Sequence, residues 1–304
     1  MSGEKIFIAG SEGFIGRNLV NYFKSEGFEV FGCDLSDFST DEYTYFRVSP
    51  SMSELEEILR THNFSYCINS SGSGSVPNSL SDPINDFEAN SLTVVRLLDA
   101  IRRYRPECRF LQISSAAVYG NPQKLPVSEE LPCAPLSPYG YHKWISELIC
   151  REYTTLYKMR IAIVRPFSTY GPGQRKQILW DICTKIKNED YVKLFGTGNE
   201  SRDFIHVHDL AVLMHCIIKS DKFNCDIFNA ASGKESKISE IVAIFKEYYK
   251  EGKFKFSGEE RLGDPLNWQA DISKVSSLGF QPSMSLDKGI LEYLKWFEMV
   301  QLTR

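Results

Sequence analysis

Short apolar runs alternate with amphipathic stretches along the first half of the chain. Five runs, at residues 5–9, 29–33, 66–69, 110–113 and 160–164, have the length and composition of buried strands. Residues 43–48 form a further plausible strand. Between these runs, apolar residues recur at helical spacing over about 17–26, 52–61, 82–104 and 138–157. The alternation predicts an α/β fold in which helices cover a parallel sheet.

The second half of the chain is patterned less regularly. Residues 240–249 and about 286–297 carry apolar side chains at helical spacing, which indicates helices that pack against a core. The sequence has no internal repeat and no low-complexity linker. A length of 304 residues suits a large sheet domain with a smaller second lobe.

Charge, hydrophobicity and cysteine spacing indicate which binding partners and which cellular compartment to expect. The net charge of -4 and the pI near 5.8 argue against general nucleic-acid binding. No apolar run approaches the ~18 residues of a membrane span, and the first residues show no signal-peptide pattern, so we expect a cytoplasmic protein. The eight cysteines are scattered without a C-x-x-C spacing, which is typical of buried thiols in a reducing compartment.

A glycine-rich turn follows the first predicted strand. Gly10, Gly13 and Gly16 form a G-x-x-G-x-x-G pattern before a helix, where backbone N–H groups can approach a pyrophosphate. Asp34 ends the next strand. An acidic side chain there can accept both hydroxyls of an adenosine ribose and repels a 2′-phosphate. The pattern therefore favours NAD as the cofactor, with NADP as the alternative.

Hydroxyl groups and a lysine converge in the middle of the chain. Ser114 and Ser115 follow the strand at 110–113, at the strand end where open α/β sheets bind ligands. Tyr139 and Lys143 lie four apart on one face of the helix at 138–157. An ammonium beside a phenol favours the phenolate, so Tyr139 could move a hydroxyl proton while Ser115 holds the same oxygen. The alternative is an exposed Tyr and Lys on a surface helix.

Further segments complete a resemblance to a known family. Val118-Tyr119-Gly120 follows the serines, residues 165–172 resemble an R-x-x-N-x-Y-G-P segment, and residues 202–209 resemble R-D-[FY]-I-x-V-x-D. With the Y-x-x-x-K pair, the chain resembles the extended short-chain dehydrogenases/reductases, in their nucleotide-sugar epimerase, dehydratase and 4-keto-reductase branch.

The resemblance implies a fold and a division of the chain. The fold is a Rossmann-type doubly wound parallel sheet with a smaller mixed α/β substrate-binding lobe. Residues 1–167 would form the NAD(P)-binding Rossmann domain and residues 168–304 the nucleotide-sugar-binding lobe. A segment at about 204–230 could return to the first domain.

The same resemblance implies a set of site residues. The expected catalytic residues are Ser115, Tyr139 and Lys143. Cofactor contacts are expected from Gly10, Gly13, Phe14, Ile15, Gly16, Asp34, Asn69, Ser70, Ser71, Ser114, Tyr139, Lys143 and Pro166. Substrate contacts are expected from Ser73, Ser115, Ala116, Ser168, Arg202, Arg261 and Asp264. Asn90 is expected to brace neighbouring strands. No metal is expected, because His206 and His208 would share a strand face without a third ligand cluster.

Departures from the family pattern bear on the reaction. Ser70 and Ser71 occupy positions where similar enzymes carry alanines. This segment would either contact the ribose or sugar or form a flexible loop. Ser168 replaces an Asn of the family pattern. Ala116 and Ala117 replace the Asp-Glu of 4,6-dehydratases, so dehydration is not expected. We expect reduction of a 4-keto-6-deoxy sugar on a nucleotide diphosphate. The alternatives are a nucleotide-sugar 4-epimerase and a non-catalytic NAD(P)-binding regulatory protein.

An assembly is also expected. Similar enzymes pair two helices from each subunit, here those at about 82–104 and 139–157, into a four-helix bundle. The second helix carries more apolar side chains than packing on one sheet requires, including Trp144, Leu148 and Tyr153. We therefore expect a homodimer, with packing beneath the substrate lobe as the alternative.

Overall fold

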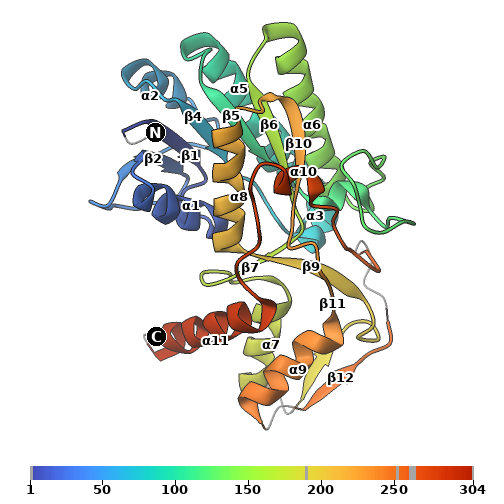
Figure 1. Cartoon of the computed structure of the whole chain (residues 1–304). Coiled ribbons are helices and arrows are strands. Elements are labelled where there is room, and N and C mark those ends of the chain that lie inside the picture. The colour runs from blue at the N-terminus through green and yellow to red at the C-terminus, as the bar shows by residue number, and fades with distance from the viewer. Residues whose placement is uncertain (1–2, 189–190, 251–252, 260–264, 303–304) are drawn as a thin grey trace.

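A seven-stranded sheet forms the upper part of the molecule in Figure 1. The computed structural model describes residues 3–188, 191–250, 253–259 and 265–302. The strand order is β10-β6-β5-β4-β1-β2-β3, and all neighbouring strands are parallel. The strands are β1 Lys5–Ala9, β2 Glu29–Asp34, β3 Thr44–Arg47, β4 Tyr66–Asn69, β5 Arg109–Ile113, β6 Ile161–Pro166 and β10 Asn224–Ala230. The order reverses at β1, which makes the sheet doubly wound and confirms the predicted fold class.

Helices cover both faces of this sheet. Alternate side chains of β1 face opposite sides, so Ile6 and Ile8 join one apolar core while Phe7 joins another. Helices α1 and α8 close the first core, and α2, α5 and α6 close the second. Their bounds are α1 Phe14–Ser25, α2 Leu55–Thr61, α5 Thr93–Tyr104, α6 Pro138–Tyr157 and α8 Val207–Ser220.

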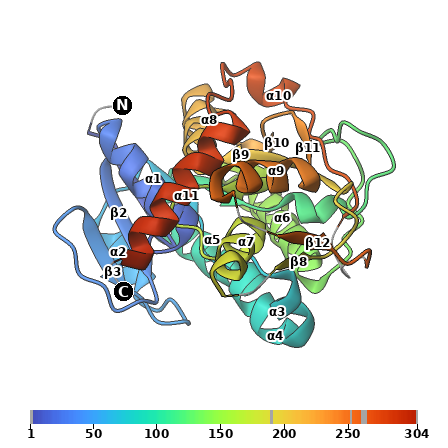
Figure 2. The ribbon, with the colours of Figure 1, turned by 90° about the horizontal axis from the view of Figure 1, so that it is seen from below.

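A smaller mixed α/β part lies below the sheet in Figure 1, and Figure 2 shows it from below. A three-stranded sheet has the order β11-β9-β7, and β8 pairs with β12. Helices α7, α9 and α11 pack a third apolar core against these strands. The elements are β7 Ser168–Tyr170, α7 Gln177–Asn188, β8 Val192–Leu194, β9 Ser201–His206, β11 Glu235–Lys237, α9 Ile238–Tyr249, β12 Phe254–Phe256 and α11 Leu286–Leu302. The short helix α10, Ser273–Ser276, instead packs against β10 and α8 of the large sheet.

The helical stretch at 82–104 differs from the single helix that periodicity predicts. It consists of α4 Pro83–Phe87, a π-helical turn η1 Glu88–Leu92 and α5, and a further helix, α3 Val76–Ser81, precedes it. The wider π-turn lets Ser91 donate a hydrogen bond to the His142 carbonyl on α6, 3.0 Å away. Contact between elements distant in sequence therefore decides the local helix type.

Two helix starts also differ from the prediction. Helix α1 begins at Phe14 rather than near Arg17, because Gly13 has the extended conformation of an N-cap and the helix starts inside the glycine turn. Helix α2 begins at Leu55 rather than Met52, because Met52 has a φ of 55°, outside the right-handed helical region.

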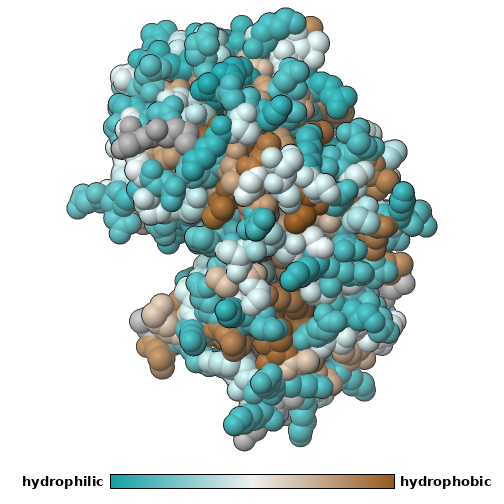
Figure 3. All heavy atoms as spheres, viewed as in Figure 1, coloured by the Kyte–Doolittle hydropathy of each residue, from teal (hydrophilic) through white to brown (hydrophobic). Residues whose placement is uncertain are grey.

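The surface in Figure 3 is mostly hydrophilic, with apolar atoms showing at its middle and in its lower half. Among the residues that the structure describes, no helix is both long and apolar enough to cross a membrane.

Candidate active site

The glycine turn joins β1 to α1 at the carboxyl edge of the sheet. Gly10 has a φ of +78°, and a Cβ there would lie 2.6 Å from the Ser71 nitrogen. A Cβ on Gly16 would lie 2.0 Å from the Gly10 carbonyl oxygen. Only glycine fits either position, since both approaches involve backbone. Gly13 caps α1 without a side-chain hydrogen bond, so the first N–H groups of the helix are not used by a cap. The next two residues, Phe14 and Ile15, are half-buried.

Asp34 lies beside this turn, as predicted. Its carboxylate accepts a hydrogen bond from the Glu12 nitrogen at 3.1 Å and another from the Leu35 nitrogen at 2.7 Å. The Ser36 hydroxyl donates to the same carboxylate at 3.2 Å. Asp34 thereby links the end of β2 to the turn that would hold a dinucleotide.

The polar residues after β4 mainly brace the backbone. Asn69 is buried and donates to the Gln112 side chain on β5 at 2.9 Å, while its oxygen accepts from the Ser71 nitrogen at 3.1 Å. The Ser70 hydroxyl donates to the Ala9 carbonyl at 2.7 Å. The side chains of Asn69, Ser70 and Ser71 therefore fix the strand end against the glycine turn, and their predicted contacts with the cofactor stay predictions.

Ser73 and Asn90 lie further along this segment. Ser73 helps to line a small polar hollow together with Asn78, Ser81, Asp82, Asn85 and Asp86. Asn90 lies in the π-turn, where its amide is buried against Gly72 and makes no hydrogen bond within the described residues. Bracing of neighbouring strands by Asn90 therefore stays a prediction, with no direct hydrogen bond to a strand among the described residues.

The residues after β5 separate into three environments. The Ser114 hydroxyl donates to buried Glu147 at 2.5 Å, so this side chain faces α6 rather than the site. Ser115 is half-buried, and its hydroxyl accepts from the Ala117 nitrogen at 3.1 Å at the start of η2, Ala116–Tyr119. Ala116 has no exposed surface and packs in an apolar cluster with Trp268. The side chains of Ser114 and Ala116 are thus used within the protein, and the predicted contacts of Ser114 with the cofactor and of Ala116 with the substrate stay predictions.

Tyr139 lies in the first turn of α6, next to Ser115. Ser137 caps the helix by accepting from the Gly140 nitrogen at 3.2 Å. A Cβ on Gly140 would lie 2.8 Å from the Ala117 carbonyl oxygen, so the helix start is pressed against η2. Burial raises the pKa of Tyr139, a hydrogen bond with Ser115 lowers it, and the charge of Asp86 raises it further. The net direction is opposite to the one expected from a neighbouring ammonium.

Lys143 is buried one helical turn after Tyr139. Its ammonium donates to the Ile113 carbonyl at 3.1 Å, which places it at the end of β5. Burial lowers the pKa of Lys143 to about 8, while the charges of Asp86 and Glu147 act in the opposite direction. A lysine that titrates close to neutral pH can change its charge under working conditions.

A buried ion pair joins α6 to strand β6 of the sheet. Arg165 on β6 donates to both carboxylate oxygens of Glu147, at 2.9 and 2.6 Å, and to the Tyr119 hydroxyl at 2.8 Å. The Tyr119 hydroxyl donates in turn to the Asn229 side chain at 2.7 Å. Burial alone would lower the pKa of Arg165, but its bonds to Glu147 outweigh this and raise it. The sequence prediction missed this network, although Glu147 lies four residues after Lys143.

The remaining predicted residues are the cofactor residue Pro166 on β6 and the substrate residues on β7, β9 and the segment after β12. Pro166 is buried and pairs with Ala230, and Ser168 is half-buried where β7 pairs with β9. Arg202 is half-buried on β9, with its guanidinium 5.8 Å from the centre of the Trp268 ring. Arg261 and Asp264 lie outside the described residues.

The two histidines do not share a strand face as predicted. His206 ends β9 and caps α8, accepting from the His208 nitrogen at 3.3 Å, whereas His208 lies on the helix. His206 is buried, while the side chain of His208 is largely exposed. In the described part of the chain, no group of three or more His, Cys, Asp or Glu residues could hold a metal ion.

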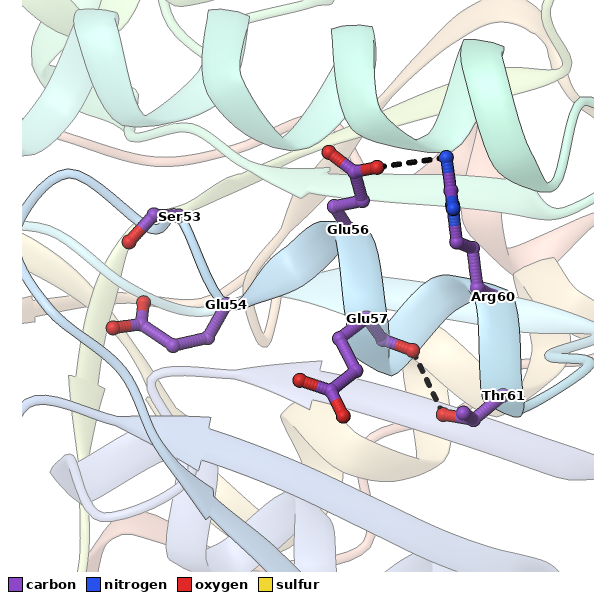
Figure 4. A pocket seen from close by; sticks show the side chains of 6 residues that line it. All are labelled: Ser53, Glu54, Glu56, Glu57, Arg60 and Thr61. Carbon is purple, nitrogen blue, oxygen red and sulfur yellow. Dashed lines mark hydrogen bonds and ion pairs between the residues drawn. The ribbon is translucent and has the colours of Figure 1, made fainter.

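A second hollow lies far from these groups, along α2 (Figure 4). Glu56 pairs with Arg60 at 2.8 Å, and the Thr61 hydroxyl donates to the Glu57 carbonyl at 2.8 Å. Both contacts join neighbouring turns of the same helix, and such pairs are common on helix surfaces. They therefore give no reason to infer a ligand in this hollow.

Comparison with known proteins agrees with the geometry. Residues 6–231 match the model of the NAD dependent epimerase/dehydratase family. A Methanocaldococcus jannaschii protein with the provisional name of a UDP-glucose 4-epimerase is 29% identical over 308 residues, covering 96% of this chain and 98% of the relative. The UDP-glucuronate 4-epimerase of Thermodesulfobacterium geofontis is 27% identical, covering 95% of this chain and 94% of the relative.

Solved structures share the fold over almost the whole chain. The UDP-N-acetylglucosamine 4-epimerase of Methanobrevibacter ruminantium, in complex with UDP-N-acetylmuramic acid, superposes with a TM-score of 0.89 at 25% identity, covering 99% of this chain and 100% of the other. The UDP-glucuronic acid 4-epimerase of Bacillus cereus, in complex with UDP-glucuronic acid and NAD, gives a TM-score of 0.89 at 24% identity, covering 97% and 99%. By its sequence motifs, its sheet order and the match over residues 6–231, the chain belongs to the NAD dependent epimerase/dehydratase family.

Proposed function

We propose that this protein is an NAD-dependent nucleotide-sugar 4-epimerase. The observation that carries the proposal is the position of the Ser115–Tyr139 pair and Lys143 at the same sheet edge as the glycine turn. A dinucleotide on that turn and a sugar hydroxyl at Tyr139 would then meet at the carboxyl ends of β1 and β5.

The comparisons favour the epimerase over the 4-keto reductase that the sequence led us to expect. The named relatives and structural neighbours described above are 4-epimerases of UDP-sugars. The expectation of a reductase rested partly on Ser70 and Ser71, and their hydroxyls bind the protein's own backbone and Asn69. These serines therefore give no reason to expect an unusual sugar pocket.

The residues present fit NAD. Gly10 and Gly16 let backbone segments approach closely, and the start of α1 has no acidic side chain that would repel a pyrophosphate. Asp34 lies where an acidic group would accept hydrogen bonds from the adenosine ribose hydroxyls. Lys143 lies at the end of β5, where we expect it to donate to the nicotinamide ribose. When bound, NAD supplies the hydride acceptor for oxidation at C4 and the hydride donor for the return step.

The protein's own groups handle the proton. Tyr139 takes the proton of the C4 hydroxyl as that carbon is oxidised, and returns it to the same oxygen when the carbon is reduced on the opposite face. Ser115 forms a hydrogen bond to this oxygen and to Tyr139, which fixes the distance between them. Protonated Lys143 favours the phenolate form of Tyr139, which is the form that accepts the proton of the sugar hydroxyl. Neither a net proton nor a net electron pair is lost over the cycle.

Other groups are proposed for the sugar nucleotide. Arg202, half-buried on β9, has the bidentate geometry that suits a diphosphate. We also assign to the sugar the hydroxyls of Ser73, after β4, and of Ser168 on β7. We assign cofactor binding to the large sheet and substrate binding mainly to the smaller part below it.

We also propose a homodimer. Ile84 on α4 is 73% exposed, and Tyr141 and Leu148 on α6 are about half exposed. Because α4 and α6 contact each other, these side chains can form one apolar surface. An isologous pairing of this surface would bury it and would hold α6, which carries Tyr139, in place.

The experiment that tests the reaction is a panel of UDP-sugars incubated with the protein and catalytic amounts of NAD. An epimerase interconverts the C4 epimers, seen by product NMR, without net change in nicotinamide absorbance. Stoichiometric oxidation of NADH with a 4-keto sugar would instead establish a reductase and overturn the proposal. Tyr139→Phe, which keeps the ring and removes the hydroxyl, is the matched control and is expected to be inactive with every sugar.

A further inference from the structure

A short segment after β12 is bonded to β9 in the smaller part of the molecule. We call this segment, residues 266–271, the strap. The Trp268 nitrogen in the strap donates to the Ser201 carbonyl on β9 at 3.2 Å. The Ala270 nitrogen donates to the buried carboxylate of Asp203, on the same strand, at 3.1 Å. These bonds fix the strap to one of the strands that we assign to substrate binding.

The strap is also bonded to the loop that follows η2. The Val127 nitrogen donates to the Gln269 carbonyl at 2.7 Å, and the Val127 carbonyl accepts from the Asp271 nitrogen at 2.8 Å. At the other end of the strap, the Leu266 nitrogen donates to the Asn121 side chain at 3.1 Å. The strap thus connects β9 to the residues that come directly after the proposed catalytic turn.

The indole of Trp268 extends this connection to the end of η2. Trp268 is 8% exposed, and its Nε1 donates to the Gly120 carbonyl at 3.2 Å. Gly120 is the C-cap of η2, and Ser115 is the N-cap of the same turn. Gly120 has a φ of +65°, and a Cβ there would lie 2.0 Å from the Ala134 carbonyl oxygen, so only glycine fits. The turn that begins at Ser115 is therefore held at its end by close backbone packing and by the indole N–H.

The ring of the same side chain lies beside Arg202. The guanidinium carbon of Arg202 is 5.8 Å from the centre of the Trp268 ring, within the range of a cation–π contact. Nη1 of Arg202 also donates to the Leu266 carbonyl of the strap at 3.3 Å. The ring of Phe167, between β6 and β7, packs edge-on against the indole with 5.5 Å between centroids. Trp268 thus contacts both the arginine proposed for the diphosphate and the turn that carries Ser115.

We propose that Trp268 is a positioning residue that couples binding of a nucleoside diphosphate at Arg202 to the placement of Ser115. The inference rests on the proposed function, which assigns Arg202 to the diphosphate and Ser115 to the sugar oxygen. Trp268 acts on the reaction through these two residues.

Binding of a diphosphate acts through both contacts of the indole. A diphosphate paired with Arg202 fixes the guanidinium beside the ring, and a cation–π contact becomes stronger as water is removed from it. A fixed indole in turn holds the Gly120 carbonyl at the end of η2. Because small errors in the placement of a reacting group are costly to the rate, a substrate held by its diphosphate meets a better-placed Ser115.

Apolar packing accounts for only part of these contacts. Trp268 shares an apolar cluster with Ala116, Tyr119 and Phe167, and a leucine or a phenylalanine would also bury apolar surface there. Such burial requires neither the indole N–H nor an aromatic ring beside Arg202. Phenylalanine removes the N–H and keeps a ring, whereas leucine removes both, so the two contacts can be tested separately.

Calorimetry with nucleoside diphosphates tests the contact with Arg202 without any turnover. The probe is whichever of UDP, dTDP, GDP and CDP the wild-type protein binds best. Trp268→Leu is expected to weaken its binding by about 5-fold, whereas Trp268→Phe should stay within about 2-fold of wild type. In the Arg202→Met background, Trp268→Leu should change the affinity by less than about 2-fold, because the cation is already missing.

Turnover tests the contact with Gly120. In Trp268→Phe the Gly120 carbonyl loses the indole donor, so kcat is expected to fall by about 10-fold while KM changes by less than about 2-fold. Trp296→Phe, which removes an indole from α11, is the matched control and should leave kcat and the affinity for the nucleotide unchanged.

The outcomes separate a positioning residue from a packing residue. Wild-type kcat in Trp268→Phe would overturn the proposal, as would an equal effect of Trp268→Leu on nucleotide affinity with and without Arg202. Failure of all four nucleotides to bind would overturn it as well. A protein that shows the coupling in binding but epimerises no sugar would instead refute the proposed function and leave the contact with Arg202 standing. Should Trp268→Leu fail to fold by circular dichroism, the separation of kcat from KM in Trp268→Phe decides the question.

Discussion

Removal of the Arg165 side chain from its buried pair should have a large and pH-dependent effect on stability. In Arg165→Met, Glu147 keeps only the hydrogen bond from Ser114 and loses two charged bonds, while Tyr119 loses one donor. Leaving one partner of a buried pair uncompensated typically costs about 3–5 kcal/mol. That is a large part of the ~5–15 kcal/mol by which a folded domain is stable.

The direction of the pH dependence follows from linkage. In Arg165→Met, the buried carboxyl group of Glu147 binds a proton more tightly in the folded chain than in the unfolded one. Its contribution to stability is therefore fully present at low pH and is lost as pH rises. The variant should lose the most stability relative to wild type at about pH 8 and less at about pH 5.5.

Urea unfolding at these two pH values measures the effect, with Glu147→Leu/Arg165→Met as the matched control. The double variant removes both charges, so it is expected to be about 2 kcal/mol more stable than Arg165→Met at the higher pH. A cost below about 1 kcal/mol in the single variant, or the same cost at both pH values, would refute the view that Arg165 compensates a buried charge.

Four further outcomes are expected. Tyr139→Phe should lower kcat by about 10²–10⁴ while calorimetry still detects NAD binding, and turnover near wild type would contradict the proton role. The pKa of Lys143 near 8 predicts that kcat/KM falls as pH rises through about that value, whereas a flat profile to about pH 9.5 would contradict it. Asp34→Ala should reduce the ratio of kcat/KM with NAD to that with NADP, and an unchanged ratio would show that Asp34 does not select the cofactor. Leu148→Glu should convert a dimer into a monomer of 34.7 kDa by light scattering, and a monomeric wild-type protein would refute the dimer itself.

Sequence patterns predict the large sheet well because both its faces are covered. Strands such as β1 and β6 are buried on both sides, so they occur as uninterrupted apolar runs between polar turns. The glycine turn is equally predictable, since Gly10 and Gly16 are required by contacts within one strand–turn–helix unit. The π-turn at η1 cannot be predicted in this way, because the apolar spacing of a helix continues through it. Its contact with α6 is formed by residues distant in the sequence.

Orientation is the part of the site that sequence patterns convey poorly. Ser114 and Ser115 are adjacent and chemically alike, yet the first points to Glu147 and the second to Tyr139. Adjacent residues at a strand end project to opposite sides, so a run of hydroxyls cannot all face one ligand. Asn69 and Ser70 illustrate the same limit, because their side chains are used within the protein.

The arrangement of charge along α6 combines a local rule with distant partners. Tyr139, Lys143 and Glu147 follow one another at intervals of four residues, so helical geometry alone places them on one stripe. The charge of Glu147 is compensated from elsewhere in the chain, by Arg165 on β6. Arg165 thereby ties α6 to β6, while the ammonium of Lys143 donates to the Ile113 carbonyl at the end of β5. Catalysis at Tyr139 should therefore depend on residues that touch neither cofactor nor sugar.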